Sequence, residues 1–404
     1  MSAARRLSPN QEDIKRQNLA ALLRYVHTNG ATSRATLTGD LGLNRSTIGA
    51  LTGDLAAAGL VREEVPRTQR AGAAGDRRAG RPSLVVSAES ARWYAVTVSV
   101  ETDRLRGARV GLGGVVFERF ETPRDRYCGI DETIKATARL IDRLMAAAPD
   151  DARPLGCGVA VCGMVQRADG AVRLSPHTGW SDEPFAEPLA AAVGQDLPVS
   201  VGNVADLSVL AEHLRGAAAG RSHVIYLYGD VGVGAGIITS GHRVTGHGGY
   251  GGEVGHMVVH PSGRSCGCGS QGCWETEIGE EAILTLAGVT DRRGRDAVLT
   301  VINAARMGDA KARAATRQVG DWLGFGVANL ANIFNPEIIL FGGMLRDVYL
   351  ATAATVRSRV NSLCLPVCRE NLRLRTPELS DDAALIGAAE VVFEPLLADP
   401  LSVS

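Results

Sequence analysis

The chain has 404 residues and is 45% hydrophobic, so it is long enough for two or three domains with sizeable cores. No apolar run approaches the roughly 18 residues of a membrane span, and the polar N-terminus lacks the apolar stretch of a signal peptide. A net charge of −1 and eight cysteines, three of them clustered, exclude a strongly basic protein and argue against a disulfide framework. We expect a soluble, cytoplasmic protein.

The charge is unevenly distributed along the chain. Residues 1–87 contain 13 Lys and Arg against 7 Asp and Glu, and the remaining residues contain 30 against 37. A basic head on an acidic body indicates that only the head meets a polyanion such as DNA. The alternative is a basic face that is merely solvated.

Three helical patterns occupy the first sixty residues. Apolar residues from Ile14 to Val26 form a helical stripe that Asn29-Gly30 ends. Ser33 is a predicted N-cap for a second helix through Leu41, and Asn44 for a third helix. Short helices joined by a tight turn predict a helix-turn-helix, with the third helix in the DNA major groove. A dimerisation or protein-docking module is the alternative.

Two predicted strands, at 60–65 and 82–86, flank a basic, glycine-rich segment and predict a wing beside the three helices. Arginines of this segment could reach a neighbouring minor groove, where narrow A·T-rich stretches attract them. The basic segment therefore favours DNA binding over protein docking. The predicted DNA-binding residues are Arg34, Asn44, Arg45, Ser46, Thr47, Arg77, Arg78 and Arg81.

From Trp93 the chain alternates predicted strands and helices, which is typical of an α/β fold. A strand-turn-strand unit opens each half, so we expect two similar lobes with a cleft between them. The strands are expected at 93–100, 109–117, 155–161, 199–201, 223–228, 234–240 and 337–342. The helices are expected at 134–148, 205–216, 280–287, 301–307, 310–334 and 383–393.

One stretch carries the spacing of a metal site, His-x9-Cys-x1-Cys-x4-Cys. One imidazole and three thiolates suit a closed tetrahedral Zn²⁺ site, and glycines between them let the loop turn tightly. Buried free cysteines are the alternative. Glu253 and Glu275 frame the stretch, and since a structural zinc needs no flanking acids, they suggest a polar ligand beside the metal. The predicted metal ligands are His256, Cys266, Cys268 and Cys273.

These motifs resemble those of the ROK family (repressors, open reading frames and sugar kinases) over residues 93–393. The resemblance implies a two-lobed, actin-like (RNase H-like) fold, and the helix-turn-helix in front makes the whole chain resemble a ROK transcriptional regulator. The motifs are Glu253-x-Gly255-His256, Gly272-Cys273-Trp274-Glu275, the glycines of 232–236, Asn335-Pro336-Glu337 and Gly342-Gly343.

We therefore expect an α/β protein in three parts. A winged helix-turn-helix domain should occupy residues 1–88, a first ROK lobe 92–200, and a second lobe with the zinc loop 201–382. The C-terminal helix at 383–396 should return to the first lobe. A homodimer or a dimer of dimers is expected, because two operator half-sites must lie an integral number of turns apart. No membrane partner is expected.

The resemblance also implies a sugar site, formed by the positions that hold sugar hydroxyls in the family. Carboxylates accept hydrogen bonds from hydroxyls, while an amide and an imidazole can donate. His256 could place one ring nitrogen on zinc and the other on the sugar. Support of the zinc loop is the alternative role for the two glutamates, and His177 lies where the cleft wall is expected. The implied sugar-binding residues are Asn203, Glu253, His256 and Glu275.

Two departures from the family's kinases predict that no catalytic residue is present. Val204 stands where the kinases have an aspartate that removes a proton from the sugar, and valine cannot act as a base. Asp206 would point about 200° away from that position on the helix. Glu101 and Asp103 stand in the hairpin that holds nucleotide phosphates, and they would repel phosphate. The sequence therefore indicates a sugar-responsive DNA-binding regulator. A bifunctional ATP-dependent sugar kinase, and a ligand-independent repressor controlled by a protein partner, are the alternatives.

Overall fold

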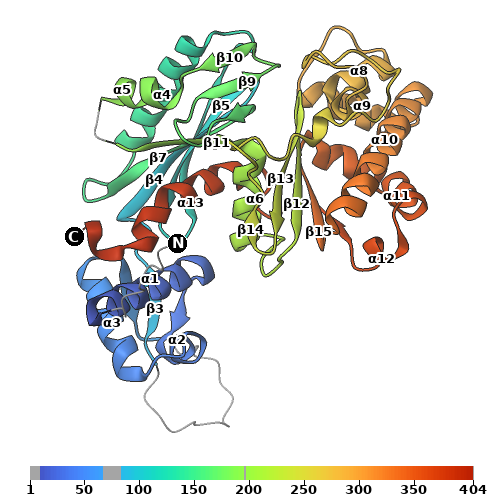
Figure 1. The fold of residues 1–404 in the computed structure, drawn as a ribbon. Helices are drawn as coiled ribbons and strands as arrows, with labels where there is room; N and C mark the ends of the chain where they lie inside the picture. The colour runs from blue at the N-terminus through green and yellow to red at the C-terminus, as the bar shows by residue number, and fades with distance from the viewer. Residues whose placement is uncertain (1–9, 67–82, 195–196, 404) are drawn as a thin grey trace, which may run out of the picture.

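The computed structural model describes residues 10–66, 83–194 and 197–403, and shows a small N-terminal domain beside two larger lobes (Figure 1). Each of the two lobes, called lobe 1 and lobe 2 in chain order, is built on a five-stranded sheet. Within the described residues, no helix is long and apolar enough to cross a membrane.

The N-terminal domain consists of three helices and a small antiparallel sheet. Helix α1 spans Gln11–Asn29, α2 Arg34–Leu41 and α3 Arg45–Ala57. Strands β1 (Thr32–Ser33), β2 (Val61–Glu64) and β3 (Val85–Ala88) pair in the order β1-β3-β2.

The predicted helix caps of this domain are confirmed. The Ser33 hydroxyl accepts a hydrogen bond from the backbone N–H of Thr36 at 3.0 Å, and Asn44 Oδ1 accepts one from Thr47 at 2.8 Å. Each cap satisfies an amide that the first turn of a helix leaves without a partner. The short sequence signals therefore fix where α2 and α3 begin.

Lobe 1 has the strand order β11-β7-β4-β5-β6. Its strands are β4 (Trp93–Val100), β5 (Arg104–Gly111), β6 (Val115–Pro123), β7 (Arg153–Val161) and β11 (Val199–Asn203), with helices α4 (Ile130–Ala146) and α5 (Ala186–Val193). A small sheet adds β8 (Met164–Val165), β9 (Val172–Ser175) and β10 (Trp180–Glu183). Alternate residues of β4 enter two different cores, because successive side chains of a strand point to opposite faces.

Lobe 2 repeats this topology with the order β14-β13-β12-β15-β16. The strands are β12 (Val224–Gly229), β13 (Val233–Thr239), β14 (His242–Arg243), β15 (Ile338–Gly343) and β16 (Arg373–Arg375). The helices are α6 (Val204–Arg215), α7 (Trp274–Ile278), α8 (Glu280–Ala287), α9 (Arg295–Met307), α10 (Ala310–Phe334), α11 (Met344–Leu363) and α12 (Pro366–Arg369). Counted within its own lobe, each sheet reads 3-2-1-4-5, so the expected pair of similar lobes is confirmed.

One predicted strand is wrong. The strand expected at 109–117 is divided by a turn, because β5 ends at Gly111 and β6 begins at Val115. Gly113 and Gly114 have φ angles of +91° and +78°, which glycine adopts without strain. The apolar residues on both sides of the turn read as one run in the sequence. Helices α5, α11 and α12 and the small sheet of lobe 1 were not anticipated.

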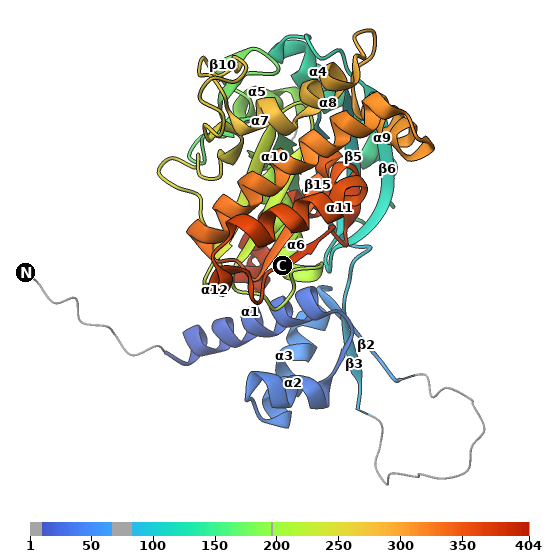
Figure 2. The ribbon, with the colours of Figure 1, turned by 90° about the vertical axis from the view of Figure 1, so that its right-hand side faces the viewer.

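Helices α6 and α13 (Ala383–Ala398) pack side by side where the two lobes meet (Figure 1). A Cβ on Gly387 would lie 1.8 Å from the backbone oxygen of Leu207, so the helices touch backbone to backbone at this point. Helix α13 also packs on β4 and β7 of lobe 1, and α1 of the N-terminal domain contacts both α13 and α6. Figure 2 shows α1 below the two lobes, on the side where α6 lies. The helix pair therefore touches all three parts of the molecule.

Candidate functional site

The cysteine-rich loop lies between the short helix η1 (Val254–His256) and α7, and two β-bridges, Val258 with Cys273 and Ser265 with Gln271, fold it back on itself. Gly272 has a φ of +72°, and a Cβ there would lie 1.8 Å from the backbone oxygen of His260. Only glycine fits this position. The folded loop gathers His256, Cys266, Cys268 and Cys273, whose ligand atoms all lie within 4.8 Å of one another.

The distances within this cluster fit a tetrahedral metal ion. Zinc–sulfur bonds of about 2.3 Å place two sulfur atoms about 3.8 Å apart. Cys268 Sγ lies 3.7 Å from Cys273 Sγ, and Cys266 Sγ lies 3.7 Å from His256 Nδ1. The four residues can therefore hold a metal ion through three thiolates and one ring nitrogen.

A cleft between the lobes opens beside this loop. Lobe 1 contributes residues 100–102 and parts of 162–180, lobe 2 contributes 228–234, and the first turn of α6 lies between them. The structure brings the proposed sugar-binding residues together, since Asn203, Glu253, His256, Glu275 and also His177 line this one cleft.

Glu275 faces both the cysteine loop and the cleft. Its Oε1 lies 3.0 Å from Cys266 Sγ and 3.9 Å from His256 Nδ1. Its Oε2 accepts a hydrogen bond from the backbone N–H of Val233 at 3.3 Å and lies 3.4 Å from His177 Nε2. The two roles considered for this residue, support of the loop and contact with a ligand, are therefore compatible.

Glu253 is a mostly buried acid at the start of η1. Burial, with the nearby carboxylates of Asp206 and Glu275, raises its pKa to about 7. Both protonation states are therefore populated near neutral pH, and the carboxyl group can either donate or accept a hydrogen bond. That versatility suits a ligand with several hydroxyl groups.

Asn203 caps α6 and joins that helix to lobe 1. Its Oδ1 accepts hydrogen bonds from the backbone N–H groups of Ala205 at 2.8 Å and Asp206 at 3.3 Å, and its Nδ2 donates to Gly163 O at 2.9 Å. One Nδ2 hydrogen is left for a ligand. A change at Asn203 would consequently affect the start of α6 and the joint between the lobes.

The first turn of α6 presents an apolar side chain to the cleft. Val204 is only 4% exposed and lines the cleft with an apolar side chain. Asp206 does not line this cleft; it borders a separate cavity with Arg167 and Arg243, as the helical rotation predicts. Among the described cleft residues, none holds a carboxylate at the start of α6.

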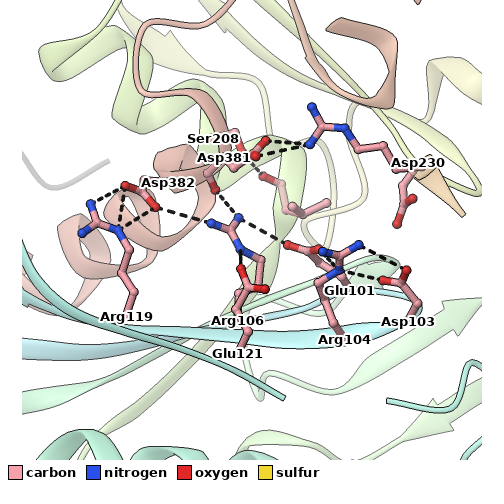
Figure 3. A network of polar contacts seen from close by, with 12 residues as sticks. Glu101, Asp103, Arg104, Arg106, Arg119, Glu121, Ser208, Asp230, Asp381 and Asp382 are labelled. Atoms are coloured by element: carbon pink, nitrogen blue, oxygen red, sulfur yellow. Dashed lines mark hydrogen bonds and ion pairs between the residues drawn. The ribbon is translucent and has the colours of Figure 1, made fainter. Parts of the chain in front are cut away.

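Ion pairs lie at a second hollow, next to the cleft, where Arg106 and Arg119 point toward Asp381 and Asp382 (Figure 3). Arg106 in β5 donates to Asp381 O at 2.7 Å and lies 3.5 Å from Asp382 Oδ1. Arg119 in β6 pairs with Asp382 at 2.6 Å, and Arg295 in α9 pairs with Asp381 at 3.1 Å. These contacts tie lobe 1 to lobe 2 across the hollow.

The turn between β4 and β5 adds acidic groups to the same hollow. Burial raises the pKa of Glu101 to about 7, and its carboxylate lies 3.6 Å from Arg106 and 3.7 Å from Arg104. Thr102 Oγ1 donates to Asp230 Oδ2 at 2.9 Å, which links the first hairpins of the two lobes. A polyphosphate would meet these carboxyl groups instead of free backbone amides.

The predicted DNA-binding residues fall into three groups. Asn44, Arg45 and Ser46 are exposed and Thr47 is partly exposed at the N-terminus of α3. Arg34 forms a two-pronged ion pair with Glu63, with Nε–Oε1 at 2.7 Å and Nη2–Oε2 at 2.6 Å, so it fastens α2 to β2. Arg77, Arg78 and Arg81 lie outside the described residues.

Sequence reasoning missed the ion pairs between the lobes. Arg106 and Asp381 are 275 residues apart, and neither belongs to a local motif. Only the alternation of charged residues in β5 and β6 hints that one face of this hairpin is polar. Sequence position alone could not indicate which partner that face would meet.

Comparisons with known proteins place these features in a family. The ROK family profile matches residues 114–394. The chain is 26% identical over 390 residues to a xylose repressor from Bacillus subtilis (strain 168), covering 96% of this chain and 98% of the repressor.

Two solved structures are similar to this chain. A ROK family transcriptional regulator, a homolog of the E. coli MLC protein, has a TM-score of 0.75 at 26% identity, with 96% of this chain and 98% of that chain covered. A ROK family glucokinase from Streptomyces griseus, in complex with glucose and AMPPNP, has a TM-score of 0.63 at 27% identity, with 74% of this chain and 98% of that chain covered.

Replacing one cysteine of the cluster should remove a bound metal. We expect the purified chain to carry about one bound metal ion, and Cys268→Ser to lose it and to lower Tm by about 5 °C or more, since a metal that binds only the folded state stabilises it. Metal content by mass spectrometry and thermal unfolding test this. Cys368→Ser, a half-buried thiol elsewhere, is the matched control. Equal metal contents in the two variants would contradict the expectation.

Proposed function

Because the chain belongs to the ROK family, we propose that it is a sugar-responsive transcriptional repressor without kinase activity. One observation carries the proposal: α6 begins at Val204 in the cleft, after its cap Asn203, and ends at Arg215, against α1 of the N-terminal domain. The similarity to a xylose repressor over nearly the whole chain supports both the repressor function and a sugar as its effector.

DNA binding is assigned to residues 1–88. Helix α3 presents Arg45, Ser46 and Thr47 at its N-terminal end, where side chains of a recognition helix meet base edges in the major groove. The N-terminus of a helix also favours a nearby phosphate group. The chain would bind a double-stranded operator as a homodimer or a dimer of dimers, with one N-terminal domain on each half-site.

The effector site is assigned to the cleft, with Asn203, Glu253, His256 and Glu275 as the sugar contacts. We assign the metal as zinc, since three thiolates and one imidazole are a common structural zinc set. Zinc would cross-link the loop and fix the ring orientation of His256, whose Nδ1 faces the sulfur atoms. The other ring nitrogen would be left for a sugar hydroxyl.

A buried charge cluster supports the link between cleft and N-terminal domain. Arg215 Nη1 donates to His27 O at 3.0 Å and to Gly113 O at 2.9 Å, and its Nε donates to Glu390 at 3.0 Å. His27, only 1% exposed, places Nε2 2.8 Å from Glu390 Oε2. These four residues come from α6, α1, the β5–β6 turn and α13.

The charges of this cluster hold α6, α1 and α13 together. Burial raises the pKa of Glu390, but His27 and Arg215 outweigh that effect and keep the pKa below its usual value, so Glu390 is ionised. Removing one member of a buried charged set costs about 3–5 kcal/mol, because it leaves an uncompensated charge. A shift of α6 on sugar binding would therefore move the N-terminal domain with it.

The absence of kinase activity is supported by two features of this chain. Val204 lines the cleft at the position where the resemblance to ROK kinases implies the catalytic base, and a well-placed base contributes about 10²–10⁴-fold to a rate. The hollow next to it is lined by Arg106, Arg295 and Asp381, whose ion pairs and those of Arg119 and Asp382 lie in and beside it. Restoring the base would leave those ion pairs in place.

The repressor function predicts that a sugar weakens operator binding. For a natural operator identified by genomic footprinting, we expect a binding sugar to change the Kd for DNA about tenfold, within the usual range of coupling between two sites. Glu253→Gln should abolish the response while DNA affinity without sugar is kept. Fluorescence anisotropy with a panel beginning with D-xylose and D-glucose tests this, with exposed Glu187→Gln as control. No response to any sugar would favour control by a protein partner.

The loss of kinase function predicts that Val204→Asp stays inactive. We expect no sugar-dependent ATP turnover in the natural chain or in this variant, because the ion pairs still occupy the neighbouring hollow. A coupled assay for ADP release, run beside a ROK glucokinase, measures this. Turnover in the natural chain would instead favour a bifunctional kinase, and turnover only in Val204→Asp would refute the role given to the ion pairs.

The buried cluster predicts a variant that uncouples the two sites. Arg215→Met with Glu390→Leu removes both charges of the ion pair, so no uncompensated charge remains. The buried His27 ring and the carbonyl oxygens of His27 and Gly113 lose their partners, so thermal unfolding checks that the variant is folded. We expect sugar and DNA each to bind within about twofold of the natural affinity, while the sugar-induced change in DNA affinity falls below about twofold.

The control for this variant is Arg24→Gln, which breaks a second ion pair between α1 and α13. Arg24 and Glu394 pair at 2.7 Å, but both are exposed, so their ion pair contributes little. Coupling should persist in this control. An unchanged sugar response in the double variant would show that the cluster does not transmit the signal.

A further inference from the structure

A second cavity between the lobes shares Asn203 with the sugar cleft. Lobe 1 contributes Arg167 and strand β11, and lobe 2 contributes Arg243 and Thr245. Helix α6 contributes Asp206, and α13 closes the cavity with apolar side chains. The cavity therefore lies against the same pair of helices that joins the lobes.

Asp206 is a buried acid without a hydrogen-bond donor. It is 8% exposed, and its Oδ1 is, among the described residues, the one fully buried carboxylate oxygen that has no hydrogen-bond partner. Burial raises the pKa of Asp206 to about 7, against the opposing charges of Arg243 and Arg167. Leaving such a group without a partner costs free energy that a hydroxyl donor from a ligand would recover.

Two arginines border the same cavity, near enough to Asp206 for their charges to act on it but not in an ion pair with it. Arg243 is partly buried and Arg167 is exposed, and within the described part of the chain neither has a carboxylate within 4 Å. By contrast, Arg106 and Arg295 in the neighbouring hollow are paired with acids. Because a guanidinium group offers several N–H donors in a plane, the pair is suited to a carboxylate or a phosphate.

We propose that this cavity is a second effector site that binds an acidic sugar derivative, a sugar acid or a sugar phosphate. A ligand hydroxyl would donate to Asp206, while the anionic group would accept from Arg243 and Arg167. The apolar side chains of Val165 and Leu207 would contact the C–H face of the sugar ring. The anion-binding part of this inference is independent of the proposed function. Only the assignment of the ligand as a sugar derivative rests on the proposed sugar response.

The position of the cavity gives this ligand a regulatory effect. Asp206 is in the first turn of α6, two residues after Val204 of the sugar cleft, and Arg243 is in β14 of lobe 2. An anion held between Arg167 and Arg243 would draw lobe 1 and lobe 2 together around α6. A ligand in the sugar cleft and a ligand in this second cavity would thus both act on α6.

Isothermal titration of the full chain tests the proposal with four probes: D-glucose, D-glucuronate, D-glucose 6-phosphate and inorganic phosphate. We expect at least one of the two acidic sugars to bind at least tenfold more tightly than D-glucose. In Arg243→Gln that ratio should fall to about one, and in Arg139→Gln, an exposed arginine on α4, it should persist. Comparing the affinities for D-glucuronate and D-glucose 6-phosphate shows whether the site prefers a carboxylate or a phosphate.

Asp206→Asn provides a second readout, because an amide can still meet a hydroxyl but carries no charge to repel an anion. Inorganic phosphate should bind this variant at least as tightly as the natural chain, and should lose at least tenfold in Arg243→Gln. Acidic sugars no tighter than glucose, or phosphate binding unaffected by Arg243→Gln, would overturn the proposal. Phosphate binding that depends on Arg243, with no sugar binding at all, would instead refute the sugar response and keep the anion site.

Discussion

The backbone contact between α6 and α13 is the constraint on which the arrangement of the three parts depends. At Gly387 there is no room for even one methyl group, because a Cβ would lie 1.8 Å from Leu207 O. The two helices therefore behave as one unit, anchored in the sheet of lobe 1 through α13 and in lobe 2 through α6. One end of this unit borders the cleft and the other meets α1, so the cleft and the N-terminal domain contact the same element.

The hollow between the lobes is lined by charged side chains of both lobes. In the similar glucokinase structure, glucose and AMPPNP are both bound. Here Arg106 and Arg119 of lobe 1 meet Asp381 and Asp382, and Glu101 sits buried at the adjoining turn. Such ion pairs are worth little when fully solvated, but a network in a partly buried hollow is screened less. The lobes are thus held by side chains of the chain itself.

The sequence indicated much of this site because its chemistry is local. His256 and the three cysteines lie within eighteen residues, and glycines such as Gly272 let that segment fold on itself. The N-caps of α2 and α3 could also be predicted from the sequence, since an N-cap accepts a hydrogen bond from a backbone amide only three residues away. The β5–β6 turn was misjudged, because apolar residues continue across Gly113 and Gly114 and conceal the break.

By itself, the sequence determined the fold class, the metal-binding spacing and the apolar residue at position 204, because each depends on residue types close together in the chain. Only the tertiary structure decided which distant groups meet. Arg215 contacts His27 and Glu390, at separations of 188 and 175 residues, and Asp206 faces Arg167 and Arg243 in a cavity apart from the cleft. Such contacts follow from the packing of whole helices and sheets, and no local pattern specifies the partner of a charged side chain.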